Sequence, residues 1–167
     1  PQLGSEQLPV IGLVPFSDTL SVPRLSDLAA QLQATWINEG KAKQRRVLHS
    51  SLIASNIAHE LHKFIAGELI ISASDRIDVL LASSQATNNG VPLAGLVLTE
   101  HHAPNTQVLD FCQSAIKNGL PILHTPLSTF ATAEQLANLS NEIPVDDTER
   151  ADQVTRFVSS HINQEWL

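Results

Sequence analysis

Residues 67–99 read GELIISASDRIDVLLASSQATNNGVPLAGLVLT. Two apolar runs within this stretch, Leu69 to Ile71 and Gly95 to Leu98, have the length of buried strands. Between them, residues 75–88 predict a helix, because apolar and small side chains recur at helical spacing at Ile77, Leu80, Leu81 and Ser84. Asn89-Gly90 ends that helix, since glycine adopts the left-handed conformation without a steric penalty. A strand, a helix and a second strand in this order are typical of a parallel β-sheet.

The same order repeats in the residues that follow. A helix is predicted over 106–117, with an apolar face formed by Val108, Leu109, Cys112, Ala115 and Ile116. Asn118-Gly119 ends it, and Leu120-Pro121 leads into a strand at residues 122–124. Asn-Gly-Leu-Pro at 118–121 echoes Asn-Gly-Val-Pro at 89–92. We therefore predict an α/β fold, a three-layer domain with a mainly parallel sheet flanked by helices and right-handed crossovers.

The segments before residue 67 are less regular. Leu8 to Val14 predicts a short buried strand closed by Pro15, and residues 21–32 predict a helix with apolar residues on one face. Residues 46–53 are expected to be extended. A further helix is predicted to start at Ser55, with an apolar face of Ile57, Ala58, Leu61, Phe64 and Ile65.

The C-terminal residues predict one more helix. Asp146 is a candidate N-cap, with Glu149 three residues on as its reciprocal partner. The apolar stripe of this helix is formed by Ala151, Val154, Phe157, Val158, His161 and Ile162. Because this stripe and the edge strands need covering, we expect a homodimer. The abrupt start at Pro1, the lack of methionine and the stripe that continues to the end indicate a piece of a longer chain.

Composition narrows the classes of partner and compartment. The net charge of −7 argues against nucleic acid as a partner, because a phosphate backbone would be repelled. Cys112 is the one cysteine, so no internal disulfide is possible, which suits a reducing compartment such as the cytoplasm. No apolar run approaches the roughly 18 residues of a membrane span. We expect a cytoplasmic protein without a membrane or nucleic-acid partner.

Ligands of open parallel sheets bind beyond the carboxyl ends of the strands. Three such ends are predicted, at residues 72–76, 99–102 and 125–128. Arg76 can pair with a phosphate or carboxylate, and the Thr99 hydroxyl can donate a hydrogen bond. The alternative is that Asp75 only caps its helix and Arg76 is an exposed residue of the first turn. The candidate ligand-binding residues are Asp75, Arg76, Thr99, Glu100, His101, Thr125 and Ser128.

Asp75-Arg76, followed 23 positions later by Thr99 at a strand end, resembles the motif that names the DRTGG domains. The likeness extends along nearly the whole chain, and its pieces occur in the order of the long bacterial phosphate acetyltransferases. Those pieces are residues 8–12 with Val14-Pro15, 36–40, 45–47, 89–91, 96–99, 119–121, and 143–147 with Glu149-Arg150.

This resemblance implies a domain plan. In that family a P-loop domain similar to dethiobiotin synthetase comes first, a DRTGG domain follows, and the acetyl-transferring domain is last. Residues 1–27 are then the C-terminal remnant of the P-loop domain, residues 28–145 the DRTGG domain, and residues 146–167 a helix leading to the catalytic domain.

The resemblance also implies a function. The family enzyme interconverts acetyl-CoA and phosphate with acetyl phosphate and CoA in acetate metabolism, and its N-terminal region is associated with oligomer assembly and control by metabolites such as pyruvate and NADH. We expect this chain to be a non-catalytic regulatory and oligomerisation domain with a small-metabolite effector. The alternative is a stand-alone DRTGG-type nucleotide or metabolite sensor. An independent enzyme using Asp75 or Glu100 as a base is a third class, which the lack of a matched acid, nucleophile or metal set argues against.

One departure from the family pattern concerns the loop after Thr99. The paired glycines of the family are Glu100 and His101 here. Glycines allow a backbone nest close to an anion, whereas a glutamate adds negative charge. The sequence therefore leaves open whether this loop still binds a ligand.

Other signals are interpreted as structural. His59-Glu60-Leu61-His62 has the second histidine one position too early for a zinc-protease helix, and His101-His102 beside Glu100 is expected to be a solvated loop. Cys112 is expected to be a core thiol. No catalytic residue, metal site or cofactor is expected. Lys41, Lys43, Arg45 and Arg46 form a basic cluster that either receives an anionic effector or acidic partner or is a solvated loop.

Overall fold

The computed structural model describes residues 10–100, 102–138 and 142–162, without the side chains of residues 18 and 19. The chain divides into two compact units. One comprises residues 22–140, and the other combines residues 1–21 with residues 141–167. Each unit is described separately below.

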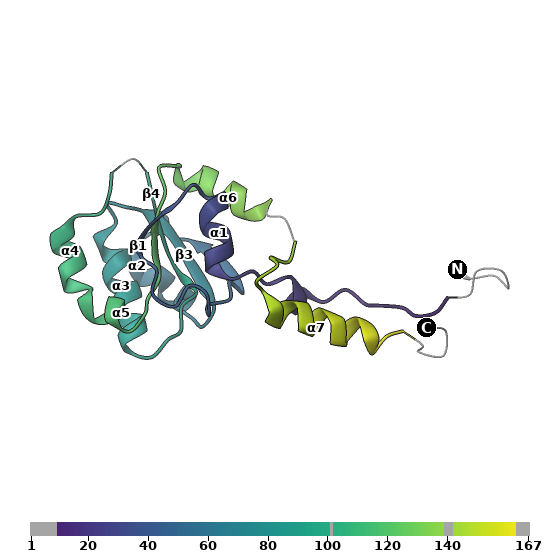
Figure 1. Cartoon of the computed structure of the whole chain (residues 1–167). Coiled ribbons are helices and arrows are strands. Elements are labelled where there is room, and N and C mark those ends of the chain that lie inside the picture. The colour runs from purple at the N-terminus through teal and green to yellow at the C-terminus, as the bar shows by residue number, and fades with distance from the viewer. Residues whose placement is uncertain (1–9, 101, 139–141, 163–167) are drawn as a thin grey trace. The chain divides into compact units, whose positions relative to one another are not determined.

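The larger unit is built on a five-stranded sheet (Figure 1). The strands are β1 (Thr35–Asn38), β2 (His49–Leu52), β3 (Glu68–Ala73), β4 (Gly95–Thr99) and β5 (Ile122–His124), in the order β1-β5-β4-β3-β2. Strands β2 to β5 are parallel, and β1 pairs with β5 in the antiparallel direction. The mainly parallel sheet is confirmed. The edge strand β1 was not predicted, because it is only half-buried and has no continuous apolar run.

Helices cover both faces of the sheet. On one face, α1 (Leu25–Gln31) and α6 (Thr129–Ala137) pack over Leu69, Ile71 and Val97. On the other, α3 (Ile77–Asn88), α4 (Thr106–Phe111) and α5 (Gln113–Lys117) pack over Ile70, Leu96, Leu98 and Ile122. The predicted three-layer α/β fold is confirmed. Because strand side chains alternate between faces, each buried strand contributes to two separate apolar clusters.

The two Asn-Gly turns end their helices as predicted. Gly90 has φ 86° and Gly119 has φ 88°, the left-handed conformation that favours glycine. The helix predicted over 106–117 is interrupted at Cys112, which separates α4 from α5. Cys112 itself is fully buried and free, so the prediction of a core thiol is confirmed.

Three local predictions are wrong in whole or in part. The helix expected from Ser55 is only one turn, α2 (Ile57–Glu60), followed by the 3-10 helix η2 (Leu61–Lys63), and Leu61 and Ile65 are exposed. Helix α3 begins at Ile77 with Arg76 in the N-cap position, so Asp75 is not its cap. Its buried face is predicted only in part: Leu80 and Ser84 are buried as expected, but Ile77 and Leu81 are exposed, and Val79, Ser83 and Thr87 are buried in addition.

The smaller unit contains the 3-10 helix η1 (Asp18–Ser21) and α7 (Thr148–Ser159). Residues 10–14 are extended and exposed, so the predicted buried strand is wrong for them, while residues 8 and 9 lie outside the described residues. Their only pairing in the described part of the chain is an isolated bridge between Gly12 and Ile162. The N-cap of α7 is Asp147, which accepts a hydrogen bond from the Arg150 amide at 3.3 Å, and not Asp146.

Across the described ranges, no helix is both long enough and apolar enough to cross a membrane.

Candidate ligand site at the carboxyl edge of the sheet

The carboxyl ends of the parallel strands border a cleft of about 390 Å³. Its floor is apolar and comes from the ends of β2 and β3, through Leu52, Ile53, Ala54 and Ala73. Its rim is formed by Asp75 and Arg76 from the loop after β3 and by Thr129 and Phe130 from the first turn of α6. The cleft therefore lies where open parallel sheets bind ligands.

Arg76 is held by the protein itself. Its Nε and Nη2 donate to the two carboxylate oxygens of Asp78 at 2.9 and 2.8 Å. Nη2 also donates to the Ser55 carbonyl at 2.9 Å, and Nη1 donates more weakly to the carbonyls of Ala54 and Ile53. The hydrogen bonds to Asp78 raise the pKa of Arg76, and those from Arg76 lower the pKa of Asp78. The guanidinium thus fixes the loop after β2 against the start of α3.

Unlike the Arg76 guanidinium, the Asp75 carboxylate makes no hydrogen bond with the described residues. Asp75 is exposed and lines the cleft. Phe130 also lines the cleft, and it is 76% exposed. The cleft therefore offers one carboxylate acceptor, an apolar floor and an aromatic ring.

Thr99 and Glu100 reach the cleft only through Thr129. The hydroxyl of Thr99 is buried and donates to the Ser72 carbonyl at 3.2 Å. The Thr129 hydroxyl lies 2.7 Å from the Thr99 hydroxyl and 3.5 Å from Oε1 of Glu100. Because each hydroxyl has a single hydrogen, Thr129 donates to Thr99, and its contact with Glu100 is weak. These hydroxyls join β3, β4 and α6 and leave little capacity for a ligand.

The backbone of Glu100 has φ 81°, which non-glycine residues rarely adopt. The resemblance described above places a glycine of the family motif at this position, and the structure gives the physical reason for one. The loop conformation persists here because it is fixed by the chain around it: the Glu100 amide donates to the Leu127 carbonyl at 2.9 Å, and the Glu100 carbonyl lies 3.0 Å from Nε2 of His124.

The remaining predicted site residues do not line the cleft. Thr125 is buried, donates to the Leu32 carbonyl at 2.7 Å and accepts from the Leu127 amide. Ser128 caps α6 by accepting a hydrogen bond from the Ala131 amide at 3.2 Å. His101 lies outside the described residues. The structure therefore brings Asp75 and Arg76 to one cleft and links Thr99 and Glu100 to its edge, but gives Thr125 and Ser128 structural roles.

Six of the residues that line this cleft are absent from the predicted site, namely Leu52, Ile53, Ala54, Ala73, Thr129 and Phe130. Ile53 and Ala54 follow β2, and their place beside the loop after β3 depends on the parallel pairing of β2 with β3. Thr129 and Phe130 follow the capping Ser128. Phe130 stands two positions after Ser128 in the sequence, so an aromatic residue close to a predicted site serine is a signal that could have indicated this contact.

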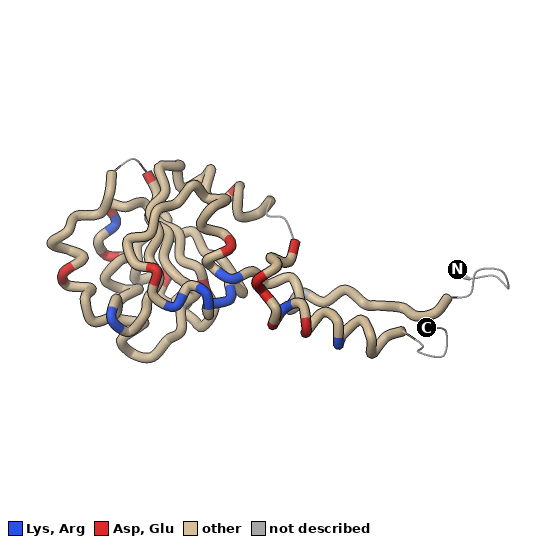
Figure 2. The backbone as a smooth tube through the Cα atoms, in the orientation of Figure 1, with Lys and Arg blue, Asp and Glu red and all other residues tan. Residues whose placement is uncertain are grey.

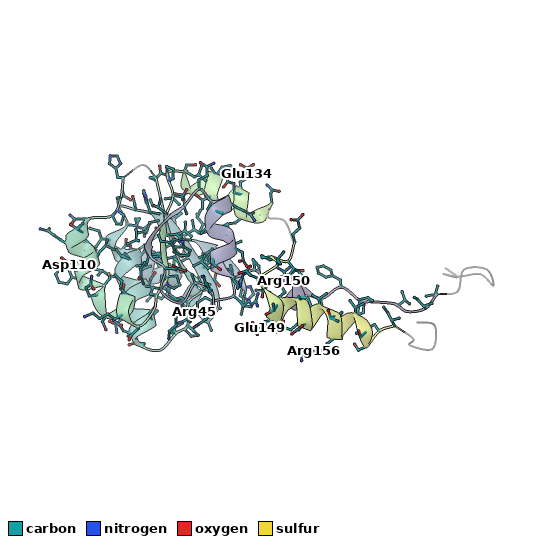
Figure 3. All side chains as sticks on the ribbon, viewed as in Figure 1. Arg45, Asp110, Glu134, Glu149, Arg150 and Arg156 are labelled. Atoms are coloured by element: carbon teal, nitrogen blue, oxygen red, sulfur yellow. The ribbon has the colours of Figure 1, made fainter. Side chains whose placement is uncertain are left out.

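The basic cluster lies at the opposite edge of the sheet. The turn at residues 40–44 is docked by a hydrogen bond from the Lys41 amide to the Gly119 carbonyl at 3.1 Å, close to the start of β5, and Ala42 within it is fully buried. Lys and Arg gather along this turn (Figure 2), and Arg45 follows it directly (Figure 3). Partial burial lowers the pKa of Arg45. Among the described residues, no group of three or more His, Cys, Asp or Glu is placed to hold a metal ion.

Comparison with known proteins agrees with this architecture. A family model described as the DRTGG domain matches residues 27–139. The five-stranded sheet with helices on both faces defines the chain as a three-layer α/β domain with a ligand-sized cleft at the strand ends. The chain belongs to the DRTGG domain family.

Relatives of known name are phosphate acetyltransferases. The chain is 70% identical over 165 residues to that of Acinetobacter baylyi, covering 99% of this chain and 23% of the relative. It is 40% identical over 167 residues to the enzyme of Pseudomonas putida, and 39% identical over 163 residues to that of Escherichia coli. The chain spans about 23% of the length of these curated relatives.

A solved structure shows the same fold. The CBS and DRTGG domains of the regulatory region of Clostridium perfringens pyrophosphatase, complexed with the activator diadenosine tetraphosphate, match with a TM-score of 0.54. The two sequences are 17% identical, and the match covers 90% of this chain and 66% of the other.

Proposed function

We propose that this chain is a non-catalytic regulatory and oligomerisation segment of a phosphate acetyltransferase, an enzyme that interconverts acetyl-CoA and phosphate with acetyl phosphate and CoA. The observation that carries the proposal is the 70% identity to the Acinetobacter baylyi enzyme over 99% of the chain. Within this proposal, residues 1–27 are the end of a preceding P-loop domain, residues 28–145 are the DRTGG domain, and residues 146–167 lead to the acetyl-transferring domain.

The geometry of the cleft supports a role without bond-making chemistry. Acyl transfer needs an activated nucleophile or a positioned acid and base. In the described part of the chain, the hydroxyls of Thr99 and Thr125 are buried and bonded to backbone carbonyls, and the thiol of Cys112 is buried in the core. Arg76 is held by Asp78 and by backbone carbonyls. These groups hold the fold together, and the cleft is left for recognition.

An assay for acetyl transfer tests the non-catalytic part of the proposal. The chain alone, supplied with acetyl-CoA and phosphate, is expected to release no CoA, whereas full-length phosphate acetyltransferase in parallel gives the positive control. Turnover by the chain alone would refute the proposal.

A second candidate function is a stand-alone nucleotide or metabolite sensor. The ligand-sized cleft favours it, as does the likeness to a regulatory region solved with a nucleotide activator. Calorimetry with adenine nucleotides, NADH and pyruvate separates the two functions. Tight binding to the isolated chain favours a sensor, and no heat of binding favours an assembly role.

We also propose that the chain forms a homodimer in the cytoplasm, in keeping with an oligomerisation role. The exposed apolar residues of the smaller unit, among them Leu13 and Phe16, are the surface that association would cover. Light scattering over a range of concentrations is expected to give twice the chain mass, and a strict monomer at high concentration would contradict the dimer.

A further inference from the structure

We infer that the cleft at the carboxyl ends of β2 and β3 binds a planar, uncharged ring carrying an amine, of the nucleobase class, and does not bind an anionic group. This inference rests on the second candidate function, the sensor, and deepens it, since it names the ligand class of the sensing site. It rests on the charges and shape of the cleft and on the engagement of Arg76.

The charges around the cleft disfavour an anion. Among the described residues that line it, Arg76 is the only cation, and all three of its side-chain nitrogens already donate to Asp78 or to backbone carbonyls. An anion would have to displace Asp78 from Arg76 while lying close to the Asp75 carboxylate. The negative charge of the anion and that of Asp75 would repel each other, and partial burial of the two charges strengthens this repulsion.

The same groups suit an amine. The Asp75 carboxylate accepts no hydrogen bond from the described residues, so it can accept from an exocyclic amine at the rim. Binding an uncharged donor also avoids the cost of bringing a second ion out of water. The carboxylate thus selects for a hydrogen-bond donor without demanding a charged ligand.

The shape of the cleft suits a flat ring. A volume of about 390 Å³ is within the ordinary range of small-molecule sites, and the floor of Leu52, Ile53, Ala54 and Ala73 offers no charge. Phe130, which lines the cleft, is 76% exposed, and exposing so much apolar surface to water is unfavourable. A planar base stacking on this ring would cover it. Aromatic side chains bind bases in this way in proteins that have no preference for a particular base sequence.

Cations of this unit are concentrated at the other edge of the sheet. Lys41 and Lys43 lie in the turn docked on Gly119, and no acidic partner is recorded for them in the described residues. Anionic groups would be attracted to that edge and away from the cleft.

Calorimetric titration of the chain with cytidine, uridine, cytidine monophosphate and ribose 5-phosphate tests the inference. Cytosine and uracil have nearly the same shape, but only cytosine carries an exocyclic amine. We expect cytidine to bind at least about 5-fold more tightly than uridine, the monophosphate to bind no more tightly than cytidine, and ribose 5-phosphate not to bind. Adenosine, which also carries an amine, is expected to bind.

Variants locate the binding. Asp75→Asn is expected to abolish the difference in affinity between cytidine and uridine. Phe130→Ala is expected to weaken the binding of every nucleoside by about 10-fold, because the ring on which the base stacks is lost. Asp110→Asn and Phe111→Ala are matched controls, because these residues lie on α4, do not line the cleft, and Phe111 is 81% exposed. Neither control should change binding.

Three outcomes would overturn the inference: no nucleoside binding, tighter binding of the phosphorylated compounds, or equal effects of the test and control variants. These outcomes differ from failure of the proposed function. If cytidine or adenosine binds as described but leaves the rate of full-length phosphate acetyltransferase unchanged, the cleft assignment stands and the regulatory role fails.

Discussion

Glu100 has a backbone conformation that its side chain disfavours. At φ 81°, a residue with a Cβ atom loses about 1–2 kcal/mol relative to glycine, and glycine in turn loses about 0.5–1 kcal/mol more entropy on folding. We therefore expect Glu100→Gly to raise the free energy of unfolding by about 0.5–1 kcal/mol. Urea denaturation of the chain measures this change.

The matched control for that substitution is Glu134→Gly. Glu134 is an exposed residue of α6 with helical geometry, so glycine there should lower the free energy of unfolding by about 1 kcal/mol. If Glu100→Gly destabilised the chain as much as Glu134→Gly does, strain at residue 100 would be ruled out, and the contacts of the Glu100 carboxylate would be the dominant effect.

The ion pair of Arg76 and Asp78 gives the chain a dependence on acid. Hydrogen bonds from Arg76 lower the pKa of Asp78 in the folded chain below its ordinary value of 3.8. The unfolded chain therefore takes up this proton first as pH falls, so the contribution of the pair is complete above about pH 4 and is lost as pH falls through the folded pKa. Asp78→Asn should remove this loss, giving a shallower fall in stability below about pH 4.

At neutral pH the same substitution is expected to cost only about 0.2–1 kcal/mol, because the pair is partly exposed to solvent. Thermal unfolding at a series of pH values measures both effects. Asp110→Asn serves as the control, since no ion pair of Asp110 is recorded in the described residues, and it should leave the acid limb unchanged. Equal slopes for all three proteins would show that the pair does not set the acid dependence.

The sequence predicts site residues correctly where they come directly after the carboxyl end of a strand. Asp75 and Arg76 were placed at the cleft on that reasoning, and they do line it. The sequence could not show that the Arg76 side chain donates its hydrogen bonds to Asp78. Whether these two side chains can meet depends on where helix α3 begins, and α3 begins two residues later than predicted. Thr99 and Thr125 look alike as strand-end hydroxyls, but each bonds to a different backbone carbonyl that only the packing brings near.

At the level of the elements, the two Asn-Gly turns look equivalent in sequence but differ in their surroundings. A Cβ atom added at Gly90 would meet nothing within 4 Å, whereas one added at Gly119 would lie 2.7 Å from Cγ of Lys41. We expect Gly90→Ala to cost about 1–2 kcal/mol from its backbone conformation alone. Gly119→Ala should cost about 0.5–1 kcal/mol more, because the Lys41 side chain must move.

A double-mutant cycle separates these two contributions. Lys41→Ala in the Gly119→Ala background should remove the extra cost, so that the alanine substitution at residue 119 then resembles the one at residue 90. Denaturant unfolding of the four proteins of the cycle measures the coupling. Zero coupling would mean that the turn at residues 40–44 is not held against Gly119 as the structure has it.

The elements were predictable where burial is complete. Strands β3, β4 and β5 are buried along most of their length and were placed from apolar runs alone. Strand β1 and the one-turn helix α2 were not, because their burial is partial and depends on neighbours distant in the sequence. The buried face of α3 was predictable only in part, at Leu80 and Ser84. Its inward residues also include Ser83 and Thr87, whose hydroxyls bond to carbonyls of their own helix and so tolerate burial.

At the scale of the whole molecule, the two units differ sharply in charge. Residues 1–21 and 141–167 carry eight Asp and Glu against two Lys and Arg, so most of the net charge of −7 belongs to the smaller unit. That unit has no sheet and no large apolar cluster in its described residues, so its order depends on polar contacts. The larger unit has a small net charge and a double core, and should be much the more stable of the two.

Arg150 joins two segments of the smaller unit, α7 and the residues that end at Ser21. Arg150 lies near the start of α7 (Figure 3). It is 4% exposed, its Nε donates to the Leu20 carbonyl at 2.7 Å, and its amide donates to the capping Asp147. Removing a buried charged donor leaves its acceptors unsatisfied, which typically costs about 3–5 kcal/mol. We therefore expect Arg150→Gln to increase amide hydrogen exchange in residues 18–21 and in α7, while exchange in β3, β4 and β5 stays unchanged.

The control for this substitution lies on the same helix. Arg156 is exposed, and within the described residues its side chain donates only to the Asp152 carbonyl one turn earlier, so Arg156→Gln should change exchange in α7 very little. Both substitutions remove one positive charge from α7, so a general effect of charge on amide exchange would be the same in the two variants. Any difference in exchange between them therefore comes from the buried contact of Arg150. Similar exchange in the two variants would mean that Arg150 does not hold α7 to residues 18–21. Faster exchange in β3, β4 and β5 with Arg150→Gln would mean that the two units unfold together, because a contact confined to the smaller unit would then control the stability of the larger one.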